Sequence, residues 1–202
     1  MDSSYIILVL IIITVSIVIY YNTGDREMVY VKSNVDGENY MVRNNSTKQQ
    51  ASNILATIKA NIYAVTNYMY NRIDTPKYKN HKQYVQQLHD KIQNVVVRES
   101  SSNSVYTSYT INKGESIVFC IRSKDITKTL EQSNIHDLNL LMYVALHEIS
   151  HVACPEKDHT PLFKNIFNFI CLEAVEMNLY KKIDFRANPT EYCGMTITDS
   201  II

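Results

Sequence analysis

Apolar positions recur at helical spacing in two stretches of the first half of the chain. In residues 48–70 an apolar side chain returns every three or four positions, and residues 82–94 repeat the pattern after the helix-breaking Thr75-Pro76 pair. We therefore expect two amphipathic helices whose apolar faces contribute to a core. The apolar positions concerned are Ala51, Ile54, Leu55, Ile58, Ile62, Val65, Met69, Tyr84, Val85, Leu88 and Ile92.

The middle of the chain has the pattern of a β-hairpin. Residues 106–111 are typical of a strand, and residues 116–122 include five consecutive apolar residues, as in a short buried strand. Between them, Asn112-Lys113-Gly114 offers a turn in which glycine can take a positive φ. The two segments are therefore predicted to pair.

Two more helices are predicted in the second half. Asn134 can cap the first, with Asp137 in its first turn, and Pro155 follows its end near residue 153. Thr160-Pro161 combines a cap with proline at the first helical position, which is a strong start signal for the second. Together with the hairpin, these helices predict an α+β domain over residues 47–202.

The N-terminal segment is predicted to be a transmembrane anchor. Residues 5–21 form an uncharged run, and the two tyrosines at its end suit a membrane interface. The start of the chain has no basic residue and the run has no small-residue cleavage site, so an anchor is favoured over a cleaved signal or a buried segment. Residues 22–46 are polar and are interpreted as a linker or stalk.

The predicted orientation follows from the basic residues. None precedes the apolar run, whereas Arg26, Lys32 and Arg43 follow it. By the positive-inside rule the large domain faces the cytosol, in a virion or host membrane. We thus expect a single-pass membrane protein.

Charge and cysteine usage narrow the picture further. Lys plus Arg and Asp plus Glu each number 20, so nothing draws the whole chain toward nucleic acid. Cys120, Cys154, Cys171 and Cys193 form no C-x-x-C pair, and two of them lie in apolar runs where free buried cysteine is common. We favour free thiols and a reducing compartment, with two disulfides as the alternative.

The residues with the clearest chemistry form an H-E-x-x-H motif. His147 and His151 are four positions apart within a predicted helix, so both imidazoles can reach one Zn²⁺ from the same face. Glu148 lies beside them, where it can act as general base on a zinc-activated water that attacks a peptide carbonyl. The motif predicts peptide hydrolysis with zinc as cofactor and a protein or peptide as substrate.

A catalytic zinc site needs a third protein ligand. His159 follows the Pro155 break at the start of the next helix, where a loop can return it to the metal. Glu173, in the middle of that helix, is the rival, because some zinc sites take a carboxylate from a later helix. We favour His159. Tyr192 and Tyr109 are candidate donors to the developing oxyanion.

The spacing of these residues resembles a known group of enzymes. His147-Glu148-x-x-His151, followed by His159-Thr160-x-x-Phe163, is similar to the WLM and SprT-like zinc metallopeptidases. Residues 108–122 and the Tyr192-Cys193-Gly194 triplet resemble WLM-type proteins encoded by large DNA viruses, so the similarity covers about residues 106–195. It implies a minimal zincin-like fold, with helices packed on a small sheet and the metal in the cleft, and it assigns the ligand and base roles to the same four residues.

Two other functions remain open. One is a membrane-anchored structural or adaptor protein with a non-catalytic zinc site, although such sites are usually closed by four ligands. The other is a protease that acts on DNA–protein crosslinks. The absence of a basic cluster beside the motif argues against nucleic acid as a partner.

Overall fold

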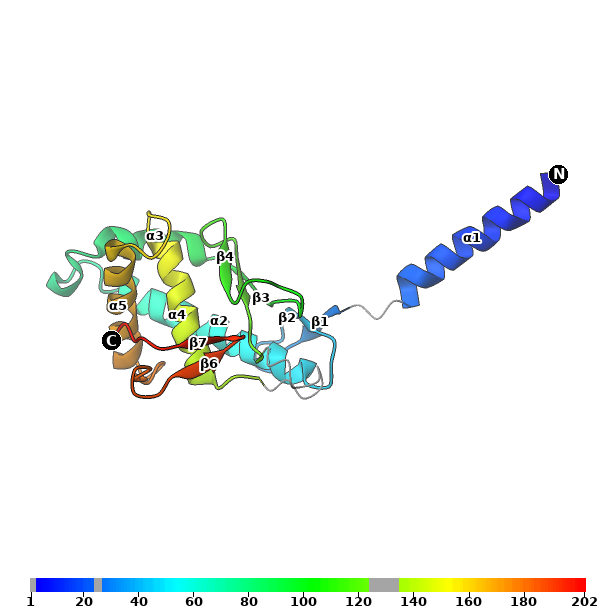
Figure 1. The fold of residues 1–202 in the computed structure, drawn as a ribbon. Coiled ribbons are helices and arrows are strands. Elements are labelled where there is room, and N and C mark those ends of the chain that lie inside the picture. Colours follow the sequence, from blue (N-terminus) through cyan, green and yellow to red (C-terminus); the bar gives the residue numbers. More distant parts are fainter. Residues whose placement is uncertain (1–2, 24–26, 124–134) are drawn as a thin grey trace.

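The computed structural model describes residues 3–23, 27–123 and 135–202, and the elements within them form an α+β fold (Figure 1). The helices are α1 (Ser3–Thr23), α2 (Lys48–Tyr70), α3 (Lys82–Ile92), α4 (Leu138–Ala153) and α5 (Pro161–Glu176), with a 3₁₀ turn, η1, at Pro76–Tyr78. The strands are β1 (Met28–Lys32), β2 (Asn39–Arg43), β3 (Val96–Glu99), β4 (Tyr109–Ile111), β5 (Ser116–Phe119), β6 (Thr190–Tyr192) and β7 (Met195–Ile197).

Helix α4 lies at the centre of the domain. It packs against α2, α3 and α5 and also contacts strand β4. Twelve of its 16 residues are buried, so only a narrow stripe of the helix reaches solvent or a cavity. Its N-terminus is capped by Asp137, whose side chain accepts a hydrogen bond from the amide of Asn139 at 2.8 Å. Asn134 lies outside the described residues.

The largest sheet has three strands in the order β3-β5-β4. The predicted hairpin is confirmed, because β4 pairs antiparallel with β5 in a register that places Thr110 opposite Ile117. The connecting turn has positive φ at Asn112, Lys113 and Gly114. A Cβ on Gly114 would lie only 3.1 Å from a methyl group of Val152 on α4, so glycine lets this turn press against the helix.

The stretch interpreted as a linker contains the hairpin β1–β2, which packs against α2. A buried ion cluster also joins it to the sheet. The amide of Arg43 donates to Glu99 Oε2 at 2.8 Å, and the guanidinium of Arg122 donates to Glu99 Oε1 at 2.6 Å. The hairpin is therefore part of the domain, and the interpretation of residues 22–46 as a linker or stalk does not hold for residues 28–43.

The prediction of a transmembrane anchor at residues 5–21 is also wrong. The apolar run does form helix α1, which lies apart from the other elements (Figure 1). However, no helix in the described part of the chain is both long and apolar enough to cross a membrane. A span takes about 20 consecutive apolar residues, and the apolar run at residues 5–21 is shorter. A single-pass membrane protein with its large domain facing the cytosol is thus not supported.

Two of the four cysteines are bonded to each other, contrary to the prediction of free thiols. Cys120, just after β5, forms a disulfide with Cys193 in the turn between β6 and β7, while Cys154 and Cys171 are free and buried. The fold brings together two residues that are 73 positions apart. The bond fastens the C-terminal hairpin to the central sheet.

Candidate metal centre

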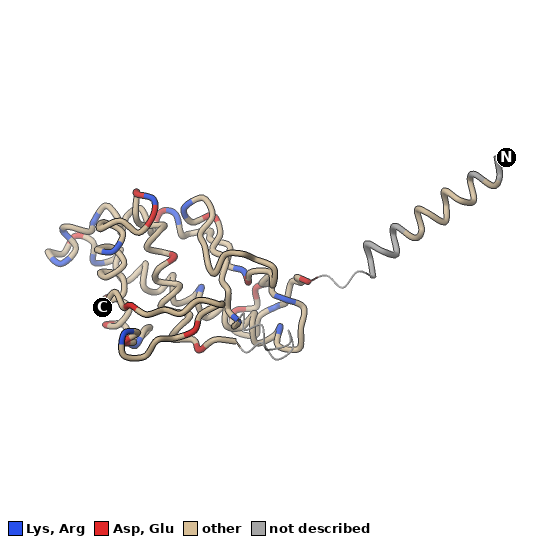
Figure 2. Tube along the Cα trace, viewed as in Figure 1, with Lys and Arg blue, Asp and Glu red and all other residues tan. Residues whose placement is uncertain are grey.

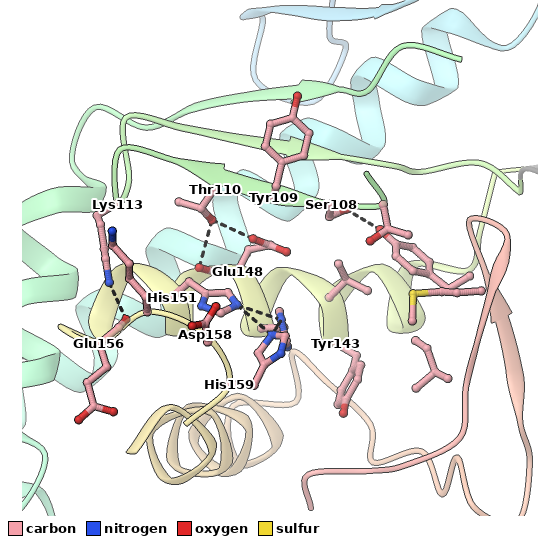
Figure 3. A pocket seen from close by; sticks show the side chains of 17 residues that line it. Ser108, Tyr109, Thr110, Lys113, Tyr143, Glu148, His151, Glu156, Asp158 and His159 are labelled. Atoms are coloured by element: carbon pink, nitrogen blue, oxygen red, sulfur yellow. Dashed lines mark hydrogen bonds between the residues drawn. The ribbon is translucent and has the colours of Figure 1, made fainter. Parts of the chain in front are cut away.

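Three histidine side chains converge beside α4. His147 and His151 are one turn apart on the helix, and His159 comes from the loop that follows it. The distance between Nε2 atoms is 3.1 Å for His147 and His151, 3.2 Å for His151 and His159, and 3.0 Å for His159 and His147 (Figure 3). In a tetrahedral zinc site, ligand nitrogens are about 3.3 Å apart, so the donor atoms fit such an ion.

Local chain geometry places His159 at the entrance of α5. Asp158 takes a left-handed φ of 64°, which turns the loop back toward α4. Immediately after His159, the Thr160 hydroxyl accepts a hydrogen bond from the amide of Phe163 at 3.2 Å, and Pro161 occupies the first turn. The histidine is therefore held between a tight turn and a capped helix start.

An aromatic side chain from α5 supports all three imidazoles. The ring of Phe163 stacks on His151 with centroids 4.2 Å apart, and its centroid is 5.0 Å from those of His147 and His159. Phe167 adds an edge contact to His147 at 5.1 Å. The side chain of Phe163 is 2% exposed, so this ring forms the floor of the histidine cluster and restricts its rotamers.

The environment favours neutral imidazoles, which are the form that binds metals. Burial, followed by the charges of His151 and His159, lowers the pKa of His147 to about 3. Burial and the charge of His159 lower the pKa of His151 to about 4. Three ring nitrogens that aim at one point are better satisfied by a cation than by each other, because a neutral imidazole has only one N–H. The cluster could therefore hold a metal ion.

Glu148 lies on the adjacent face of α4, next to strand β4. Its side chain is almost completely buried and lines the same cavity as the histidines. The Thr110 hydroxyl donates to Glu148 Oε2 at 2.9 Å (Figure 3). Burial raises the pKa of Glu148 to about 7, and the Thr110 hydrogen bond opposes that rise. Near neutral pH this carboxyl can therefore both accept and release a proton.

The histidines and Glu148 open into a cavity of about 600 Å³ between α4, β4 and the β6–β7 hairpin. One end carries charged groups, where Lys113 donates to the carbonyls of Cys154 and Glu156 at 2.6 and 2.9 Å. The other end is apolar (Figure 3). The aromatic and aliphatic residues that line the cavity apart from the histidines include Tyr143, Val144, Tyr192, Met195 and Ile197.

Of the two candidate third ligands, the structure places only His159 beside the pair. Glu173 is fully buried elsewhere, accepts a hydrogen bond from Tyr78 at 2.5 Å and lies 2.6 Å from the ammonium of Lys77. Its carboxylate is thus occupied by a separate ion cluster. Sequence reasoning missed Thr110, and no pattern within the sequence links a strand threonine to a helix glutamate.

The two candidate oxyanion donors both line the cavity but differ in orientation. Tyr192 is buried, and its hydroxyl lies 2.5 Å from the Ser108 hydroxyl. Tyr109 packs its ring against Tyr106 and points away from the histidines in Figure 3. The ring of His136 contacts Tyr192, with centroids 5.3 Å apart, and does not belong to the cluster.

Comparison with known proteins finds similarity to three viral proteins. It is 38% identical over 203 residues to the uncharacterized protein R325 of Acanthamoeba polyphaga mimivirus, with 99% of each chain covered. The chain belongs to the family of this mimivirus protein. Over 73 residues it is also 41% identical to the uncharacterized protein 136R of Invertebrate iridescent virus 6 and 36% identical to the uncharacterized protein 042R of Invertebrate iridescent virus 3.

These two shorter similarities cover 36% of this chain, with 38% of the first iridescent-virus protein and 42% of the second. No protein-family model matches the chain, and no solved structure does either. The comparisons thus show the family, and the three relatives named are all viral proteins.

Proposed function

We propose that this protein is a zinc metallopeptidase that hydrolyses peptide bonds. The observation that carries the proposal is the convergence of three imidazole nitrogens beside a buried carboxylate, within one cavity. Three protein nitrogens leave a fourth position of a tetrahedral ion open, as in catalytic rather than structural zinc sites. The proposal also draws on the resemblance of the spacing of His147, Glu148, His151 and His159 to that of the WLM and SprT-like metallopeptidases.

Each protein group has a distinct part in this reaction. His147, His151 and His159 would hold the ion through Nε2. Zinc, when bound, supplies Lewis-acid chemistry that acidifies water and polarises a carbonyl. Glu148 accepts a proton from the attacking water and delivers it to the departing amine, a role that suits a carboxyl with a pKa of about 7. Burial of Glu148 keeps competing water away from this proton transfer.

The shape and charge of the molecule favour a peptide over a nucleic acid. The chain has no net charge, and its acidic and basic positions are intermixed along the described trace (Figure 2). Affinity for nucleic acid depends mainly on Lys and Arg side chains that contact phosphates. The cavity instead offers an apolar end and a few polar groups, as expected for a site that binds peptide side chains.

The proposal is tested by metal analysis and peptide cleavage on the same samples. Wild-type protein should bind one equivalent of zinc and cleave members of a mixed peptide library, with products identified by mass spectrometry. His159→Ala should lower zinc affinity at least about tenfold and abolish cleavage. If wild-type protein binds zinc tightly but cleaves no peptide, a non-catalytic zinc protein becomes the better interpretation.

A further inference from the structure

Within the described residues, the side chain of Glu148 has one hydrogen-bond partner, Thr110 on strand β4. The Thr110 hydroxyl lies 2.9 Å from Glu148 Oε2 and 3.3 Å from the backbone oxygen of the same residue. Glu148 Oε1 makes no hydrogen bond to any described group, and the side chain faces the cavity. The two carboxylate oxygens thus differ, one being anchored to the strand and the other free to exchange a proton.

The position of Thr110 is fixed by the turn that follows it. Lys113 donates to the carbonyls of Cys154 and Glu156, at and just beyond the end of α4, where a cation is also favoured by the helix dipole. Gly114 approaches Val152 too closely for any larger residue to fit without a shift. The hairpin β4–β5 therefore contacts α4 or its C-terminal end at three successive positions, Thr110, Lys113 and Gly114, and the contact of Thr110 is the one made with Glu148.

We infer that Thr110 is a positioning residue for the general base, an inference that rests on the proposed peptidase function. The hydroxyl holds Oε2 and so restricts the carboxylate to one rotamer, with Oε1 directed at the water and leaving amine. Without it, the buried carboxylate keeps its place on the helix but can rotate away from the reacting atoms. A misplaced base slows the chemical step and leaves substrate binding intact.

The test is Thr110→Val, which removes the hydroxyl and keeps the shape of the side chain. We expect kcat to fall about tenfold to a hundredfold, as for the loss of a hydrogen bond to a charged group. KM should change less than about twofold, and zinc stoichiometry should stay at one. Thr110→Ser should restore most of the rate, because serine keeps the donor. Thr196→Val, the same change at an exposed position of β7, is the matched control.

A second measurement does not depend on activity. In the metal-free protein, Thr110→Val should lower the urea midpoint of unfolding in the wild-type background and have little effect in a Glu148→Ala background. An equal loss in both backgrounds would show that the hydroxyl has only a structural role and would overturn the inference. So would an unchanged kcat, or a rise in KM with kcat unchanged.

The outcomes separate this inference from the proposed function. Active wild-type protein with unaffected Thr110→Val refutes the positioning role alone. Zinc-loaded wild-type protein without peptidase activity refutes the proposed function, and with it any role in positioning a base. If Thr110→Val does not fold, Thr110→Ala compared with Thr110→Ser decides the same question, because only serine retains a hydroxyl.

Discussion

Reduction of the Cys120–Cys193 disulfide should destabilise the domain substantially. The bond closes a loop between residues 73 positions apart. In the chain-entropy description, opening a loop of this size costs about 4 kcal/mol of stability. With a urea dependence of about 2 kcal/mol per molar for a domain of this size, the midpoint should fall by about 2 M. Reduction should also loosen the wall of the candidate site, because the β6–β7 hairpin held by this bond carries the cavity-lining residues Tyr192, Met195 and Ile197.

The assay is urea unfolding followed by circular dichroism, with and without a dithiol reductant. The matched control is the double variant Cys120→Ala/Cys193→Ala, whose midpoint should already be low and should not respond to the reductant. Cys154 and Cys171 are free in both proteins, so they cannot account for a difference. A wild-type midpoint that stays the same on reduction would refute the reasoning, because it would mean that this bond does not restrain the unfolded chain.

Three further predictions concern single side chains. Metal-free Glu148→Gln should be more stable than wild type at pH 8 by up to about 3 kcal/mol. The folded-state pKa of Glu148 is about 7, above the ordinary 4.5, so the stability of the wild type falls as pH rises between these values. Unfolding measured at several pH values should show that the difference vanishes near pH 4. Glu173→Ala should cost roughly 3 kcal/mol, since it leaves the buried Tyr78 hydroxyl unpaired, yet calorimetric zinc binding should be unchanged; a loss of zinc would transfer the ligand role from His159. Phe163→Ala should cost about 3–5 kcal/mol and also weaken zinc binding, and retention of full affinity would contradict its role as support for the imidazoles.

The helices could be predicted from the sequence because their signals are local. The apolar stripe of α2 and the Thr160-Pro161 start of α5 gave the helix positions that the structure has. The β4–β5 hairpin was also predictable, because its turn residues lie between two strand patterns. The H-E-x-x-H spacing placed two histidines on one helix face, and the start signal of α5 placed His159 near them.

The features that were missed depend on contacts between distant parts of the chain. Strand β3 is four residues long and pairs in parallel with β5, so nothing in its own pattern reveals its partner. The β1–β2 hairpin is mixed in polarity because it covers α2 on one side and meets solvent on the other. The disulfide and the Thr110–Glu148 hydrogen bond join residues that only the fold brings together. At residues 5–21, apolar character and the tyrosines at the end of the run predicted a membrane span that the structure does not support.

The central claim is that Glu148 acts as the base beside a zinc ion held by three histidines. It is tested most directly by the rate of peptide hydrolysis by Glu148→Gln, measured with the zinc content of the same sample. Glutamine keeps the size of the side chain and cannot accept the proton. The account predicts one equivalent of zinc with hydrolysis reduced by at least about a hundredfold. A zinc-loaded Glu148→Gln protein that hydrolyses peptides at the wild-type rate would contradict it.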